Sequence, residues 1–460
     1  MSSFDEEWLE KFREIILSYN KQRISDPFME WFREQARART NLATTLINTR
    51  CFCSADMQGL PRLRFERDAK ILITSVGIAS LSGGFAGVVQ SIYLNMIGIS
   101  PVLIGLVASV AIVASALRMV LFGVLADKIG RKKVLVLIFM TSIGYNLIYF
   151  LARDYAFFLL AAVIGGAGGE GYGGYVEGSL LSEKVGDSRR NFAFSIQYFV
   201  GSSLSALGSF ASGLPDFISA NLQVSLSDAI RLTFALQALL IVPATLSVFL
   251  ISEDSRRMDD REERYLSPES RKKIAKLSFA GLFDGLGVGL FMTLSSLWFY
   301  LRFGMDIKSV GYVFTLSKIP ESVAYLFGPM IAKKKGLVRT FSMARFAGGI
   351  AAIALAFMPT YPLAAILYAT RNAVQHIGTS LRTSYTLSIF NRRERASAAS
   401  LSNLASTGGN SLATSISGYM MQNVSTFLPP LISGAIIGIA AQMYYLLFRN
   451  TRPPEESQPH

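Results

Sequence analysis

The sequence predicts an all-α membrane protein with twelve transmembrane helices in two pseudo-symmetric bundles of six. Of its 460 residues, 51% are hydrophobic and only 17% are charged, and the mean hydropathy is +0.37. A soluble protein of this size needs more charge to cover its surface. From residue 69 onward, apolar runs of roughly 20–25 residues alternate with short loops, and this is the length that a helix needs to cross a bilayer. In lipid such runs must satisfy their own backbone hydrogen bonds, which favours helix.

The apolar runs set the expected helices and the regions around them. We expect the twelve helices at 70–95, 101–126, 133–152, 156–182, 191–213, 229–252, 274–301, 309–331, 338–358, 361–389, 396–421 and 425–448. The regions are then a cytoplasmic extension at 1–68, a six-helix bundle at 69–252, a charged cytoplasmic loop at 253–273, a second bundle at 274–448 and a cytoplasmic tail at 449–460.

The extension contains apolar residues at helical spacing, and we expect an amphipathic helix there. Such a helix can pack on the membrane-embedded region, lie on the membrane surface, or bind a partner.

The basic residues predict the orientation of the chain. The net charge is +13, and the Lys and Arg residues gather in short loops on one side of the predicted helices. The positive-inside rule places these loops, and both termini, in the cytoplasm of a cell that carries the protein in its plasma membrane. The charge is therefore expected to face anionic lipids, not nucleic acid. Cys51 and Cys53 form a lone pair without further ligands, so we expect ordinary thiols, no metal site and no cofactor.

An internal repeat relates the two predicted bundles. Glycines recur at offsets of 205 or 206 residues and fall at equivalent points of the hydropathy pattern. The matched pairs are Gly98 with Gly304, Gly105 with Gly311, Gly123 with Gly328, Gly130 with Gly336 and Gly213 with Gly418, and Arg190 matches Arg395. A row of matches at one offset predicts a parallel repeat.

The loop after the second predicted helix carries a charged motif, from Gly123 to Lys133 (GVLADKIGRKK). Gly123 permits close helix contact, and Gly130 permits a tight turn. Asp127 is an acid among bases at a helix end, where a neighbouring helix N-terminus or an arginine can meet it. Arg131 and the lysines after it favour the anionic inner leaflet.

This loop resembles the G-x-x-x-D-[RK]-x-G-[RK]-[RK] signature of the major facilitator superfamily, in the position where that family carries it. The resemblance covers residues 69–448 and implies twelve helices around a central cavity. It also implies a cytoplasmic latch in which Glu183 pairs with Arg131, Asp127 meets the start of helix 11 near Ala396, and Arg190 begins helix 5. The second copy of the loop lacks the acid, so only the first can form the whole latch. Sub-family signatures are missing, and the sub-family is left open.

Ionisable residues inside predicted membrane spans are costly and are candidate substrate or proton sites. They are Arg118, Glu170, Glu177, Asp284, Lys318, Glu321, Arg371, His376 and Arg382. Helix 4, which holds Glu170 and Glu177, is rich in glycine, and this favours close packing or a bend.

The candidate sites have different expected roles. Glu170 is the favoured proton carrier, since burial in the membrane makes a carboxylate easier to protonate, and Asp284 is second. Arg371 is the favoured anion-binding group, because a guanidinium binds a carboxylate with two bonds.

Structural alternatives remain for the other charges. Arg118 can pair with Glu177, Lys318 can neutralise Glu321 at i,i+3, and His376 can be a polar core residue.

Together these features predict a secondary active transporter, not an enzyme, because no metal-ligand cluster or nucleophile arrangement is present in the sequence. We expect alternating access, a small organic solute that is anionic or zwitterionic, coupling to protons, and a monomer. The alternatives are a multidrug efflux transporter of the same fold, and a receptor or scaffold that keeps the fold without transport.

Overall fold

The computed structural model describes residues 66–165, 174–185, 190–252, 268–390 and 395–449. The chain separates into two compact units, Met1–Arg64 and Phe65–His460, and everything below belongs to the second. The described residues form helices and short connections, without a strand.

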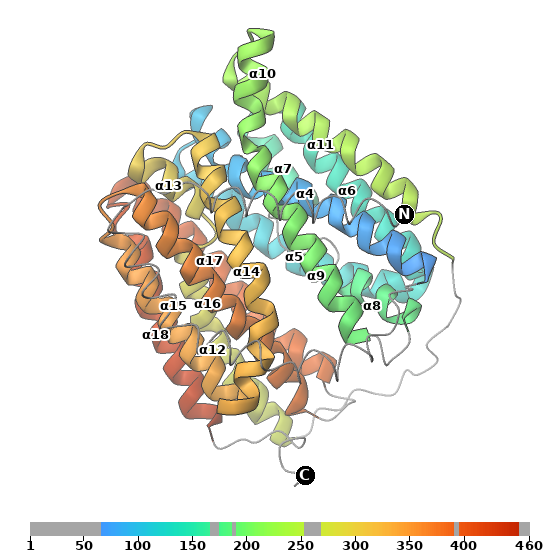
Figure 1. Cartoon of the computed structure of the whole chain (residues 1–460), viewed down its shortest axis with the longest axis vertical. Helices are drawn as coiled ribbons and strands as arrows, with labels where there is room; N and C mark the ends of the chain where they lie inside the picture. The colour runs from blue at the N-terminus through green and yellow to red at the C-terminus, as the bar shows by residue number, and fades with distance from the viewer. Residues whose placement is uncertain (1–65, 166–173, 186–189, 253–267, 391–394, 450–460) are drawn as a thin grey trace, which may run out of the picture. The chain divides into compact units, whose positions relative to one another are not determined.

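The first group of helices follows the first half of the chain (Figure 1, blue to green). It comprises α4 (Arg67–Met96), α5 (Pro101–Ile129), α6 (Arg131–Leu151), α7 (Tyr155–Gly165), α8 (Gly174–Lys184), α9 (Arg190–Phe210), η3 (Ala211–Gly213), α10 (Leu214–Leu222) and α11 (Leu226–Val248).

The second group of helices follows the second half of the chain (Figure 1, yellow to red). It comprises α12 (Pro268–Phe291), α13 (Ser295–Phe303), α14 (Ile307–Lys335), α15 (Leu337–Ala356), α16 (Tyr361–Ser388), α17 (Arg395–Asn423) and α18 (Leu428–Phe448).

Each of the twelve predicted spans contains one or two of these helices. Within the described residues, seven helical stretches are long and apolar enough to cross a membrane. The helices of the other predicted spans are shorter or more polar, and several of their polar residues line the cavity described below. The all-α fold is confirmed, and the count of twelve crossings stays a prediction.

Two predicted spans differ from single helices. The span at 156–182 is represented by α7, which ends at Gly165, and α8, which begins at Gly174; residues 166–173 between them lie outside the described part. The span at 274–301 was expected to be one helix; it falls within Ser270–Phe303, which is long and apolar enough to cross a membrane, but a turn interrupts the helix. Residues 292–294 form a turn between α12 and α13, where Ser295 N–H donates to the Met292 carbonyl at 3.3 Å.

The hydrophobic core is shared between the groups at one end only. We call the end that carries Gly130, between α5 and α6, the loop end, and the opposite end, which carries Gly98, the far end. The largest buried cluster joins Tyr149 and Phe234 of the first group with Phe291 and Trp298 of the second. Toward the loop end each group has its own cluster. Apolar burial therefore holds the groups together mainly toward the far end.

Contacts between the groups obey a two-fold relation. Gly105 of α5 packs against Gly418 of α17, and the repeat-equivalent Gly311 of α14 packs against Ser212, beside Gly213. In a two-fold interface, each contact recurs with the partners exchanged.

Hydrogen bonds repeat in the same way. Ser109 Oγ donates to the Ser411 carbonyl at 2.6 Å, and the equivalent Thr315 Oγ1 donates to the Ala206 carbonyl at 3.3 Å. Ser91 bonds to Ser296, its own equivalent, at 2.9 Å, so this pair lies on the pseudo-two-fold axis.

Four glycines show that the repeat also governs the backbone. Among the described residues, the glycines with positive φ are Gly98 (91°), Gly130 (98°), Gly304 (60°) and Gly336 (82°). They are two of the pairs that the sequence repeat predicts. A residue with a Cβ rarely adopts this conformation, so glycine is required at both copies of each turn.

Candidate functional site

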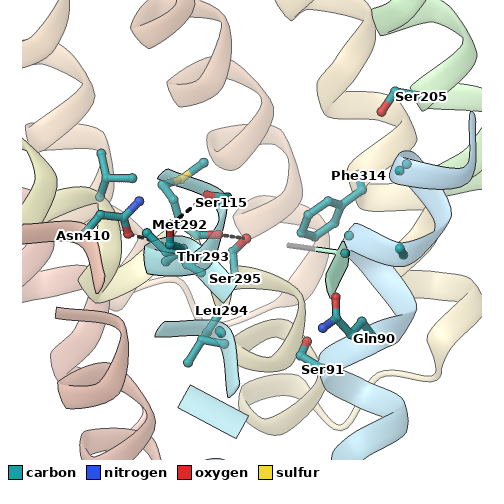
Figure 2. A pocket seen from close by; sticks show the side chains of 18 of the residues that line it. Gln90, Ser91, Ser115, Ser205, Met292, Thr293, Leu294, Ser295, Phe314 and Asn410 are labelled. Atoms are coloured by element: carbon teal, nitrogen blue, oxygen red, sulfur yellow. Dashed lines mark hydrogen bonds between the residues drawn. The ribbon is translucent and has the colours of Figure 1, made fainter. Parts of the chain in front are cut away.

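A cavity of about 570 Å³ lies between the two groups of helices. It is lined by α4, α5, α6, α9, α14, α16 and α17, with residues from the ends of α7, α8, α12 and α13. This volume is in the range of small-molecule sites. Figure 2 shows side chains of both groups around it, with Gln90 and Ser91 of α4 on one side and Asn410 of α17 on the other.

Three titratable side chains meet in the cavity wall on α14 and α16. Glu321 Oε1 lies 3.4 Å from Lys318 Nζ on the same helix and 3.4 Å from His376 Nε2 on α16. All three residues line the cavity, and Glu321 is 4% exposed. The sequence predicted the Lys318–Glu321 pair from its spacing. It did not predict that His376 would share the same carboxylate oxygen.

Neutral polar groups complete the wall of the second group. Thr293 Oγ1 donates to Asn410 Oδ1 at 3.1 Å, and the Ser295 and Tyr368 hydroxyls are 3.0 Å apart. Thr293 lies in the break between α12 and α13, and Ser295 is the first residue of α13; both are labelled in Figure 2. These hydroxyl and amide groups can orient a polar solute.

Arg371 lies just behind this wall. Its side chain is fully buried and does not line the cavity, but its Nη1 contacts the sulfur of Met292, which does. Its guanidinium carbon lies 5.6 Å from the centre of the Phe291 ring. The predicted anion-binding group is therefore next to the cavity and covered.

Asp284 lies in a separate buried cluster within the second group. Its Oδ2 accepts hydrogen bonds from Arg345 at 3.0 Å and from Arg382 at 2.8 Å, and these residues come from α12, α15 and α16. The Arg382 guanidinium also lies over the Tyr444 ring. Neither Asp284 nor Arg382 lines the cavity. Arg345 was missed from the sequence, although an arginine within a predicted span was a signal for it.

Replacing Asp284 by asparagine is expected to destabilise the protein by about 3–5 kcal/mol, because two buried guanidinium groups then face each other without a carboxylate. Thermal unfolding of the detergent-purified protein measures this. The control is Glu183→Gln, which breaks a part-exposed ion pair (29% exposed at Glu183) and should cost less than about 1 kcal/mol. An equal loss of unfolding free energy in the two variants would show that the Asp284 cluster does not hold α12, α15 and α16 together.

The predicted pair of Arg118 with Glu177 is absent, and this interpretation was wrong. Arg118 lines the cavity and donates to the Val163 carbonyl of α7. Glu177 is buried, does not line the cavity, and its Oε2 has no hydrogen-bond partner among the described residues. Glu170, the favoured proton carrier, lies outside the described residues.

The motif loop joins helices of the first group at the loop end. Arg131 pairs with Glu183 of α8 and donates to the Ser179 carbonyl at 3.3 Å. Lys132 donates to the carbonyls of Phe249 and Ile251 beyond the end of α11, at 2.9 and 2.7 Å. The pairing of Arg131 with Glu183 is the one that the resemblance implied, and its role as a latch stays a prediction.

Other motif residues are less defined. Gly123 was expected to permit a close helix contact, but a Cβ built there meets no heavy atom within 4 Å among the described residues. The side chains of Asp127, Arg190 and Ala396 lie outside the described part.

Comparisons with known proteins agree with this architecture. The family model of the Major Facilitator Superfamily matches residues 72–370 and 277–460. An uncharacterized membrane protein of Saccharomyces cerevisiae is 22% identical over 412 residues, which cover 81% of this chain and 92% of the relative.

Two solved structures show the same fold. A bacterial homolog of the human lysosomal transporter Spinster, in an inward-facing and unoccupied conformation, has a TM-score of 0.66 at 14% identity, covering 85% of this chain and 98% of that one. A D-xylose-proton symporter has a TM-score of 0.65 at 14% identity, covering 82% of this chain and 97% of that one. With a family model that spans most of the sequence and a matching fold, the chain belongs to the major facilitator superfamily and is a membrane transporter, not an enzyme.

Proposed function

We propose that this chain is a proton-coupled secondary transporter of small organic solutes that carry a carboxylate or another anionic group. The observation that carries the proposal is the Lys318–Glu321–His376 cluster in the wall of the central cavity. The cluster places one carboxylate and two basic side chains together at the cavity wall, where a proton and a solute can reach the same residues.

Proton and solute can be coupled through this cluster. When Glu321 is ionised, it attracts Lys318 by charge, and it attracts His376 as well when the imidazole is protonated. When Glu321 is protonated, that attraction is lost, and the two bases become available to an anionic solute. The D-xylose-proton symporter of the same fold shows that this architecture can support proton coupling.

The orientation follows from the basic loops. We place the loop end, with Arg131 and Lys132, in the cytoplasm of a plasma-membrane protein, by the positive-inside rule. The far end then faces outward. The shared core and the two-fold contacts close this end, so the described state is inward-facing. We propose that Gly123, Asp127, Gly130, Arg131, Glu183 and Arg190 form the cytoplasmic gate that closes in the opposite state.

Uptake into proteoliposomes tests the proposal. The purified protein is reconstituted and offered a library of organic acids, zwitterions and cations, with and without an acid-outside pH gradient. Uptake is read by mass spectrometry, and protein-free liposomes are the control. We expect uptake of carboxylate-bearing solutes that rises with the gradient. Transport of chemically diverse cations alone would contradict the proposal and favour multidrug efflux, and no transport by a folded protein would favour a scaffold.

A further inference from the structure

The break between α12 and α13 borders the central cavity. α12 ends at Phe291, α13 begins at Ser295, and Met292, Thr293 and Leu294 between them all line the cavity. Figure 2 shows these residues beside one another at the cavity wall. An interrupted helix leaves backbone and side-chain groups free to contact a ligand within the membrane.

Arg371 is buried behind this break, and no carboxylate among the described residues pairs with it. Its side chain has 0% exposure, and within the described part of the chain its hydrogen-bond contacts are the Met292 sulfur and Asn372 Oδ1, the latter at 3.3 Å. Both contacts use Nη1, and Nε and Nη2 have no hydrogen-bond partner among the described residues. By contrast, Arg345, which is buried, and Arg382, which is largely buried, share the carboxylate of Asp284.

The two nitrogens without a partner form a binding edge. Nε and Nη2 lie side by side on one edge of a guanidinium, and this edge donates two parallel hydrogen bonds to a carboxylate or phosphate. Buried donors without partners raise the free energy of the protein. An oxyanion that reached this edge would remove that cost and supply the missing counter-charge.

Met292 separates Arg371 from the cavity. Its sulfur contacts the guanidinium, and its side chain belongs to the cavity lining. Methionine is unbranched and flexible, and it adapts readily to a changed environment. Tyr368 and Asn372, which flank Arg371 on α16, also line the cavity, so a small movement of Met292 would bring the guanidinium within reach of a solute.

We propose that Met292 is a displaceable cover over an oxyanion subsite, in which Arg371 binds the anionic group of the transported solute. This inference rests on the proposed function in one respect, that the solute occupies the central cavity. It adds the position of the anionic group at the α12–α13 break and the residue that must move to admit it.

Chemical labelling at the cover tests the subsite without transport or a pH gradient. Cys51 and Cys53, the only cysteines in the sequence, are replaced by serine, and Met292→Cys is introduced. The reaction rates of this cysteine with sulfonatoethyl methanethiosulfonate, an anion, and trimethylammonioethyl methanethiosulfonate, a cation, are compared in detergent-purified protein. The matched control is Thr141→Cys on α6, which lines the same cavity within the first group.

We expect the anion-to-cation rate ratio to be about tenfold higher at position 292 than at 141, because one buried positive charge acts on the nearby reagent. Arg371→Met should lower the ratio at 292 to the value at 141 and leave 141 unchanged, whereas Arg371→Lys should keep most of the preference. Equal ratios at the two positions, or a preference that survives Arg371→Met, would overturn the inference. If Arg371→Met does not fold, the rate ratios at positions 292 and 141 in the protein with Arg371 intact decide whether the subsite exists.

The result is independent of proton coupling. A charge preference at position 292 without pH-driven transport would support the subsite and contradict the proposed coupling. A protein with pH-driven transport and no charge preference contradicts the subsite alone.

Discussion

Replacing Gly418 by leucine is expected to stop transport, with the protein held away from the described state. A Cβ at Gly418 would collide with the Pro101 carbonyl oxygen and lie 3.1 Å from Gly105 Cα, and both are backbone atoms of α5 that cannot rotate away. Overpacking of this kind costs about 1–3 kcal/mol, which shifts a two-state equilibrium by about 5- to 150-fold. Because alternating access needs both states, the flux falls with the population of the disfavoured one.

The matched control for this variant is Gly408→Leu on the same helix. A Cβ at Gly408 meets nothing within 4 Å among the described residues, so this variant should keep its transport. A cysteine at Ser109, beside the interface, reports the state: its labelling from the far end should rise in Gly418→Leu and not in Gly408→Leu. Equal flux in the two variants would show that the glycine contact does not close the far end.

Glu321→Gln is expected to abolish accumulation driven by a pH gradient and to leave solute exchange intact. Glutamine keeps the shape of the side chain but cannot bind or release a proton in this range, and it no longer attracts Lys318 and His376. A gradient of one pH unit supplies about 1.4 kcal/mol for each coupled proton, so coupling to one proton supports about tenfold accumulation of the solute, which the variant should lose.

The control for Glu321→Gln is Asp228→Asn, which removes a carboxylate that pairs with Arg231 at 3.3 Å outside the cavity. Accumulation by this variant should match the unmodified protein. Accumulation that survives Glu321→Gln would place the proton on another group and remove the cluster from the coupling mechanism.

The fold follows from the sequence because its signals are local. Apolar runs of spanning length predict the helices, and matched glycines predict the repeat. The positive φ angles of Gly98, Gly130, Gly304 and Gly336 show why those glycines recur, since both copies of each turn need the same backbone.

The site follows only in part, because position along a helix does not give its rotation in the bundle. The sequence indicated Arg371, His376 and Glu321 as ionisable residues inside predicted membrane spans, and the structure brings His376 and Glu321 together. It could not predict that His376 meets Glu321 across two helices, or that Arg371 lies behind Met292, because each depends on which face of a largely apolar helix turns inward.

The break at residues 292–294 has only a weak signal in the sequence, the glycines Gly285, Gly287 and Gly289 just before it. The stretch from Leu290 to Trp298 (LFMTLSSLW) contains no proline or glycine, the residues that usually mark a kink. The polar groups of Thr293 and Ser295 find partners in Asn410 and Tyr368. Because those partners come from distant helices, the interruption depends on tertiary contacts that sequence patterns do not show.

The most direct test of proton coupling is proton movement driven by a solute alone. Proteoliposomes are loaded with a pH-sensitive dye at equal internal and external pH, and a transported solute is added outside. If the solute enters with protons through the Glu321 cluster, the interior should acidify with the unmodified protein and not with Glu321→Gln or protein-free liposomes. Solute entry without a change in internal pH, or the same acidification with Glu321→Gln, would contradict the account.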